Sequence, residues 1–253
     1  MKNLSKFILS LIAIFIFSSC SEDSDSVVED ITLKNQKVDY GEMHNTGLNA
    51  YYKWKADKIN SNLNEFSHEL VNINNSLYPK YFNNVSDIKI SKLSLKLYGT
   101  NDKTKFNYRE RSIYLIDELV AEKQISRELG NLIESFVISN PNKNQILNSI
   151  SRFKKKGVMK YNDEKGLEIF TSVYLASDQF WTERENNSFV FKSDCDPKNQ
   201  VRIADAAGGI FGGLLGTAIG GFGGIVGASV GSQGYSALVE ELQENSDGSR
   251  SCI

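Results

Sequence analysis

The histidines and the catalytic motifs decide first what chemistry this chain could perform. His44 and His68 are its only histidines, and neither stands in a metal-binding pattern such as HExxH. The sequence also contains neither a lysine-ended phosphate loop nor a GxSxG nucleophile turn. Unless a helix breaks between them, the two histidines lie about six turns apart and cannot bind one ion. The sequence therefore predicts no enzyme, no metal site and no cofactor.

The cysteines allow two interpretations. There are three, at Cys20, Cys195 and Cys252. If Cys20 is modified, Cys195 and Cys252 remain as a pair that could form a disulfide in an oxidising compartment. The alternative is two free thiols, since the separation of their Cα atoms does not follow from the sequence.

Residues 1–19 are predicted to form a cleavable export signal. Lys2 and Lys6 precede an apolar run over residues 7–17, which is short for a membrane span. The segment Phe17-Ser18-Ser19-Cys20 resembles the lipobox of bacterial lipoproteins, although Phe17 stands where leucine is usual. The resemblance implies that residues 1–19 are removed and that Cys20 carries the lipid. An ordinary signal peptide is the alternative.

Residues 20–40 are expected to form an acidic flexible tether. Glu22, Asp23 and Asp25 make its start too polar to enter a core. Acidic residues directly behind a lipidated cysteine also resemble the surface-export signal of lipoproteins in some Gram-negative lineages. We therefore expect a cell-envelope protein that is lipid-anchored to the outer membrane, exposed either on its outer face or on the periplasmic side.

Length and charge limit the number of domains and the kinds of partner. About 230 residues remain after processing, enough for one domain with a sizeable core. The chain has 29 lysines and arginines against 31 aspartates and glutamates. Such a balance gives no global field that would attract nucleic acid or an anionic membrane. No nucleic-acid partner is therefore predicted, and the net charge does not identify another.

Helical periodicity dominates residues 41–191. One stripe runs at spacings of three and four from Tyr52 to Leu77 and predicts a single helix from about Met43 to Leu77. Residues 86–97 fit either a strand or a helix. Further helical stripes occupy residues 109–137, 146–153 and 162–181, and Lys154-Lys155-Lys156-Gly157 is typical of a helix C-terminus. The fold class expected is therefore all-α, a helical bundle.

The start of the bundle carries a second resemblance. Gly41-Glu42, His44-Asn45 and Leu48 form a GExHNxxL pattern. Together with the glycine-rich C-terminal region, it resembles a group of uncharacterised Gram-negative envelope lipoproteins, and it implies no activity. The simplest role for His44 or Asn45 is a hydrogen bond that caps the first helix.

Residues 192–235 contain a glycine zipper. Gly208, Gly212, Gly216, Gly220 and Gly224 are spaced four apart, and Ala228 and Ser232 continue the row. This spacing gives a helix a flat groove that a second backbone can approach closely. Because each glycine costs about 1 kcal/mol relative to alanine, the helix needs a partner. The candidates are a bilayer, a second copy of residues 204–232, a hairpin with its own second half, or the bundle, and residues 236–253 are expected to form a polar tail.

The sequence thus favours a non-enzymatic cell-envelope lipoprotein with a structural or binding role. Its membrane partner is reached through lipidated Cys20, and its glycine segment packs helices within the chain or between copies. The alternative is a membrane-active effector, similar in composition to glycine-zipper bacteriocins and pore-forming peptides, that inserts this segment into a membrane.

Overall fold

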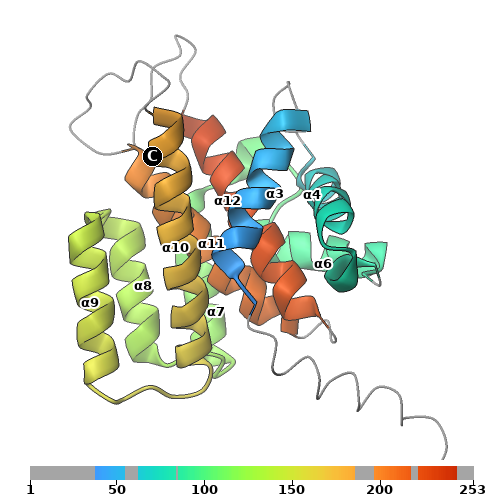
Figure 1. Cartoon of the computed structure of the whole chain (residues 1–253). Helices are drawn as coiled ribbons and strands as arrows, with labels where there is room; N and C mark the ends of the chain where they lie inside the picture. Colours follow the sequence, from blue (N-terminus) through green and yellow to red (C-terminus); the bar gives the residue numbers. More distant parts are fainter. Residues whose placement is uncertain (1–37, 55–61, 84, 186–196, 218–221, 244–253) are drawn as a thin grey trace, which may run out of the picture. The chain divides into compact units, whose positions relative to one another are not determined.

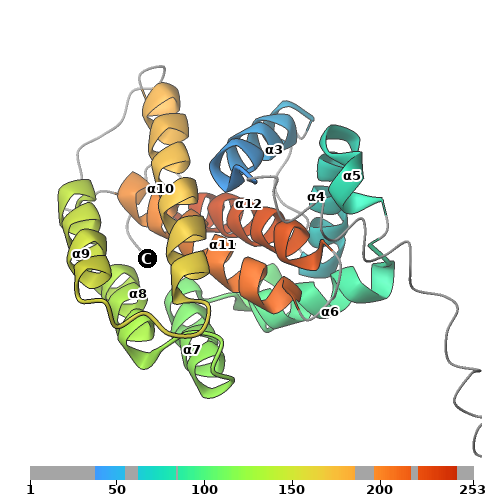
Figure 2. The ribbon, with the colours of Figure 1, turned by 60° about the horizontal axis from the view of Figure 1, so that its bottom comes forward.

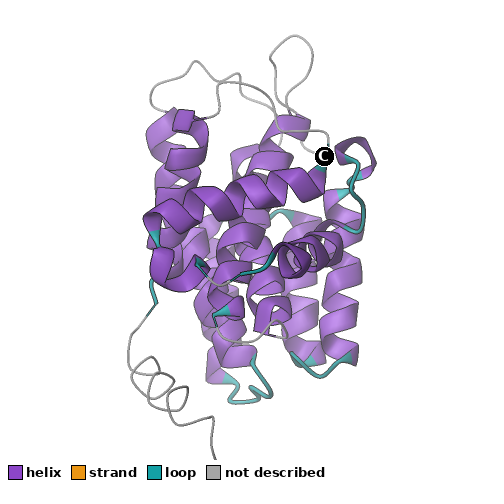
Figure 3. Ribbon diagram, turned by 90° about the vertical axis from the view of Figure 1, so that its right-hand side faces the viewer, coloured by secondary structure: helices purple, strands orange, loops and turns teal. Residues whose placement is uncertain are grey.

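The computed structural model describes residues 38–54, 62–83, 85–185, 197–217 and 222–243. From Asp39 onward they belong to one compact unit. Within these described ranges the regular secondary structure is helical, without a strand (Figure 3). The all-α helical bundle expected from the sequence is confirmed.

The described residues form a succession of helices. In chain order they are α3 (Tyr40–Trp54), α4 (Leu63–Leu77), α5 (Pro79–Phe82), α6 (Asp87–Tyr98), the 3-10 turn η1 (Lys103–Lys105), α7 (Tyr108–Ala121), α8 (Arg127–Ser139), α9 (Lys143–Lys155), α10 (Asp163–Glu185), α11 (Pro197–Thr217) and α12 (Gly223–Gln243).

The helices α11 and α12 form a hairpin at the centre of this unit (Figure 2). The other helices enclose it, with α10, α6, α7 and α8 against α11, and α3, α4 and α5 against α12 (Figure 1). Residues 198–216 and 226–240 are all buried. A helix buried on every side favours small or apolar residues around its circumference, which explains why residues 206–216 and 226–239 contain no charged side chain.

Side-chain caps fix where the outer helices begin. Asn107 and Ser126 accept hydrogen bonds from the first turns of α7 and α8. At the start of α9, Asn142 and Gln145 form a reciprocal capping box. Such caps satisfy amide groups that have no partner within the helix, and they fix the turns of the bundle.

The single helix expected from Met43 to Leu77 is wrong. The helices α3 and α4 are separate elements that pack against each other, with the rings of Tyr51 and Phe66 5.7 Å apart. Asn62 has an extended backbone and caps α4, accepting hydrogen bonds from the amides of Asn64 and Glu65. The apolar spacing continues across residues 55–61, which lie outside the described residues, so periodicity alone did not reveal the break.

The ambiguous segment 86–97 is helix α6. Ile90, Leu93 and Leu97 are buried at helical spacing, whereas Ile88 and Leu95 are exposed. The apparent alternation of a strand came from these two exposed apolar residues.

Two expected boundaries also differ from the structure. Tyr40, placed in the tether, is helical and buried. At the other end, residues 236–243, placed in the polar tail, belong to α12 and are largely buried. Both corrections have one cause, because α3 packs against α10 and α12 packs against α11.

Candidate functional site

The closest approach between helices lies along the glycines of the central hairpin. Gly208, Gly212 and Gly216 of α11 oppose Gly231, Gly227 and Gly223 of α12, respectively. A Cβ atom built on Gly212 would lie 1.8 Å from the carbonyl oxygen of Gly227. The corresponding distances are 2.3 Å at Gly208 and 2.1 Å at Gly216. No side chain fits at these positions, so the glycine row of α11 meets the backbone of α12 in the same chain.

The glycine row changes register between the two helices. Gly224 does not continue the tightest row, because a Cβ there would meet the Gly213 carbonyl oxygen at 3.2 Å. It belongs to a second, looser row in which Gly209 and Gly213 face Ser232 and Ala228. The predicted position Gly220 lies outside the described residues. The sequence-based row therefore holds for α11 but is displaced in α12, where the glycines in closest contact are Gly223, Gly227 and Gly231.

Membrane crossing was one expectation for this segment. Among the described helices, none combines the length and the apolar character that a membrane span requires.

A buried polar cluster surrounds Asp205, near the open end of the hairpin. The carboxylate Oδ2 accepts hydrogen bonds from Ser177 Oγ at 2.5 Å and from Trp181 Nε1 at 3.2 Å. His44 Nε2 lies 3.3 Å from the same oxygen, and both side chains are fully buried. Burial raises the pKa of the nearby Tyr108 hydroxyl, and the Asp205 carboxylate raises it further. The cluster therefore joins α3, α10 and α11 around one carboxylate.

Serine, histidine and aspartate occur together here, but not in the order that nucleophilic catalysis needs. In a catalytic triad the histidine stands between the serine and the acid. In this cluster Ser177 and His44 both approach Asp205 Oδ2. All three side chains are fully buried, so a substrate has no access to the serine. The arrangement fixes helices together and does not support acyl transfer.

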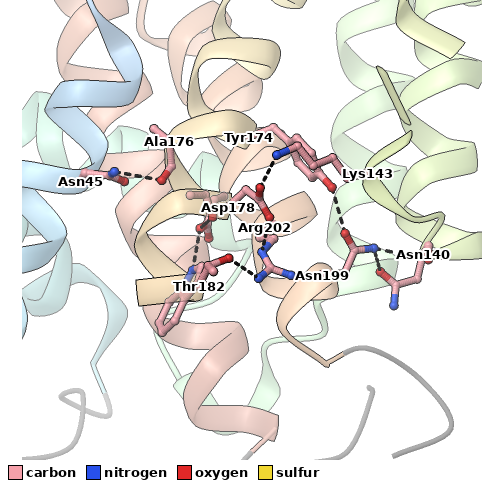
Figure 4. Close-up of polar contacts among 12 residues, drawn as sticks. Asn45, Asn140, Lys143, Tyr174, Ala176, Asp178, Thr182, Asn199 and Arg202 are labelled. Atoms are coloured by element: carbon pink, nitrogen blue, oxygen red, sulfur yellow. Dashed lines mark hydrogen bonds and ion pairs between the residues drawn. The ribbon is translucent and has the colours of Figure 1, made fainter. Parts of the chain in front are cut away.

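The first turns of α11 carry two cations, Lys198 and Arg202, and a helix N-terminus disfavours positive charge. Arg202 is neutralised by Asp178 of α10, with Nε 3.1 Å from Oδ1, and its guanidinium also donates to Thr182 (Figure 4). Asp178 is shared with Lys143 at the start of α9, 2.5 Å away. One carboxylate thus ties α9, α10 and α11 together.

Asn199 makes a second link at the same end of α11. Its side-chain oxygen accepts a hydrogen bond from the Tyr174 hydroxyl at 2.9 Å. Its amide nitrogen donates to Asn140 Oδ1 and to the Pro141 carbonyl, both at 2.8 Å (Figure 4). The turn between α8 and α9 is thereby fastened to the hairpin.

The open end of the hairpin is closed by an ion pair between its own arms. Lys198 Nζ of α11 lies 3.1 Å from Glu240 Oε1 of α12, and both side chains are nearly buried. Tyr52 of α3 donates a hydrogen bond to the other oxygen of Glu240. Lys198 also lies 4.0 Å above the ring of Trp181. A buried cation is thus surrounded by a carboxylate and an aromatic face, which compensates part of its lost hydration.

A reciprocal amide pair holds α12 against α4. Asn74 Nδ2 donates to Gln233 Oε1 at 2.7 Å, and Gln233 Nε2 donates to Asn74 Oδ1 at 3.2 Å and to the Met43 carbonyl at 3.1 Å. Gly47 leaves the room for this amide, because a Cβ there would lie 2.1 Å from Gln233 Nε2. The pair satisfies polar groups that are otherwise costly to bury.

The expected capping roles of His44 and Asn45 are wrong. The first turn of α3 is capped by Asp39, whose Oδ1 accepts from the Glu42 amide at 3.0 Å. His44 instead faces Asp205, and Asn45 Nδ2 donates to the Ala176 carbonyl of α10 at 2.9 Å (Figure 4). Both residues hold α3 to the interior because the helix begins at Tyr40, one turn earlier than expected.

The remaining predicted sites are distributed as follows. Cys20, Cys195 and Cys252 lie outside the described residues. His68 is near the surface, where it contacts Ser91 and Asp87 of α6. In the described ranges, no group of three or more histidine, cysteine, aspartate or glutamate side chains is placed to hold a metal ion.

No family model, curated protein or solved structure matches this chain. Sequence reasoning missed Asp205, Arg202, Gln233 and Glu240 as core residues. Their position in or beside an apolar, glycine-rich segment could have indicated this role. An ionisable or amide group buried in such a segment requires a polar partner.

Proposed function

We propose that this protein is a non-enzymatic, lipid-anchored lipoprotein of the cell envelope whose helical body has a structural or binding role. The observation that carries the proposal is the glycine hairpin: its closest faces are occupied by each other within one chain, and the other helices enclose it. The glycine rows of the two helices contact each other and are not available to a second molecule. They therefore form the core of a stable body. Attachment to the membrane is then the task of Cys20.

The lipid anchor is tested by labelling with a radioactive or alkyne-tagged fatty acid in the producing cell. We expect label on the native chain and none on Cys20→Ala, because acylation requires the thiol. Cys195→Ser is the matched control and should keep the label. Labelled Cys20→Ala protein would overturn the anchor.

A second candidate function, a membrane-active effector, has one specific observation in its favour. Residues 206–239 contain no aspartate, glutamate, lysine, arginine or histidine. An uncharged hairpin enclosed by other helices could enter a bilayer if the body opened. Against this candidate stand the polar links around Asp205, Arg202 and Glu240, which tie the hairpin to the other helices.

Dye release from lipid vesicles separates the two functions. A structural or binding lipoprotein should release no more dye than vesicles alone. Thr217→Glu is the diagnostic variant, since Thr217 is exposed at the end of α11 and the folded body should tolerate a carboxylate there. In a bilayer the same carboxylate would cost about 3 kcal/mol. Release by the native chain that falls in Thr217→Glu would establish the effector function instead.

A further inference from the structure

An exposed basic loop with apolar side chains connects α9 and α10. Every residue from 154 to 162 is exposed. The loop surface, as we name it, consists of four lysines and three apolar or aromatic residues: Lys154, Lys155, Lys156, Lys160, Val158, Met159 and Tyr161. Tyr161 is 58% exposed, Val158 39% and Met159 37%, high values for such side chains next to one another.

Helix capping explains only part of this composition. Cations at the end of α9 interact favourably with the helix dipole, and Gly157 adopts the left-handed conformation that ends many helices. Within the described part of the chain, however, none of the four lysines forms an ion pair. Capping also gives no reason for three exposed apolar side chains among them.

The loop is held in place by its neighbours. Asp163 is fully buried, and its carboxylate accepts hydrogen bonds from the Ser126 amide at 2.7 Å and the Lys160 amide at 2.9 Å. Asn162 contacts Gln124 through both its backbone and its side chain. A fixed loop presents its lysines and apolar side chains together, without an additional ordering cost on binding.

The loop surface lies at the end of the unit where the chain enters. The helices α3 and α10 run side by side in the same direction, since Gly41 contacts Ser172 and Asn45 contacts Ala176 (Figure 1). Lys165, in the first turn of α10, lies 4.6 Å from the ring of Tyr40 at the start of α3. The first residue of the unit and the loop before α10 therefore share one end of the body.

We propose that the loop surface docks onto the head groups of an anionic lipid bilayer. The inference rests on the proposed lipid anchor, which keeps the body near a membrane. Cys20 and Asp39 are 19 positions apart in the sequence. A fully extended chain of that length reaches at most about 68 Å. The bilayer is the partner that matches both parts of the surface: lysines attract anionic head groups, and valine, methionine and tyrosine enter the interface.

The test uses the chain from Ser21 onward, which lacks the acyl group but keeps the complete compact unit from Asp39. Sedimentation with vesicles of phosphatidylglycerol and phosphatidylethanolamine measures binding, and phosphatidylcholine vesicles serve as the neutral comparison. We expect binding to the anionic vesicles that weakens with added salt. Changing all four lysines of the loop surface to glutamine should lower the partition coefficient about tenfold or more. Val158→Ser with Met159→Ser should lower it further.

The matched control is on α6, where Ile88, Lys89 and Lys92 are also exposed. The variant Ile88→Ser with Lys89→Gln and Lys92→Gln removes exposed lysines and an apolar side chain from another face, and it should leave binding unchanged. Equal binding to neutral vesicles, no binding to either kind, or a loss in the α6 variant but not in the loop variant would each overturn the docking surface. None of these results depends on acylation, which fatty-acid labelling of Cys20 tests separately.

Discussion

Asp205 shows how one side chain can organise a helical core. It brings a carboxylate into a fully buried position in α11, where an unpartnered charge would be costly. Ser177 and Trp181 donate to it from α10, and His44 approaches it from α3. The hydrogen bonds come from residues 24 and 28 positions away in the sequence. The carboxylate therefore selects one arrangement of three helices.

Replacing Asp205 should reveal this role. Asp205→Ala leaves the Ser177 hydroxyl and the Trp181 ring nitrogen without their acceptor, so we expect the free energy of unfolding to fall by about 3 kcal/mol. Asp205→Asn keeps an acceptor oxygen of the same shape and should lose about 1 kcal/mol. Chemical denaturation measures both. Equal stability of Asp205→Ala and the native chain would show that the cluster does not contribute.

The central hairpin depends on backbone contact. Glycine is a poor helix former, yet it recurs throughout α11 and α12. The compensation is the approach of the two backbones, which brings the Gly212 and Gly227 positions too close for any side chain. Van der Waals contact along this seam replaces the side-chain packing of an ordinary helix pair.

The seam predicts opposite effects for one substitution at two glycines. Gly212→Ala should destabilise the protein by about 2 kcal/mol or more through overpacking, although alanine has the higher helix propensity. Gly166→Ala in α10 is the control, because its Cβ would meet Leu129 at an ordinary 3.4 Å. That variant should be neutral or more stable by up to about 1 kcal/mol. If Gly212→Ala melts higher than the native chain, the close approach is wrong.

The sequence predicted the helices from their apolar stripes because the spacing of apolar residues can be read within a single segment. It could not predict the register of the hairpin in the same way. A row spaced by four continues through Gly216, Gly220 and Gly224, but α12 begins anew after the turn and places Gly223 opposite Gly216. The direction in which a new helix leaves a turn depends on tertiary packing.

The break between α3 and α4 had a local signal that periodicity concealed. Asn62 caps α4 and its side chain also donates to Glu65, three residues later, the spacing of a capping pair. By contrast, the pairs Lys198 with Glu240 and Asn74 with Gln233 have no local signal. The first pair joins residues 42 positions apart and the second joins residues 159 positions apart, so only the folded chain brings them together.

An aromatic cluster extends this packing across the body. Tyr235 of α12 lies between the rings of Tyr98, Phe106, Tyr108 and Phe211, with ring centres 5.5 to 6.1 Å away. Its hydroxyl donates to the Leu97 carbonyl of α6 at 3.0 Å. The three tyrosine hydroxyls are thus buried where α6, α7 and α12 meet, and their ionisation is coupled to unfolding.

This coupling predicts a loss of stability at alkaline pH. Burial raises the pKa of Tyr98, Tyr108 and Tyr235 above the ordinary value of 10. The unfolded chain therefore loses these protons first, and above about pH 10 it binds fewer protons than the folded protein. Below that pH the three tyrosines contribute their full share to the free energy of unfolding. Above it the free energy of unfolding falls as the pH rises, by up to about 1.4 kcal/mol per pH unit for each tyrosine.

Urea unfolding at a series of pH values above neutrality measures this slope, and ultraviolet absorbance follows tyrosinate formation in the same samples. Lysines also titrate near this pH, so the slope needs a matched variant. Tyr108→Phe serves, because the Tyr108 hydroxyl forms no hydrogen bond within the described residues and its loss leaves the ring packing intact. The variant should lose about one third of the alkaline slope that the three tyrosines contribute. An identical slope, or tyrosinate that forms in the folded chain near the ordinary pKa, would show that the aromatic cluster is open to solvent.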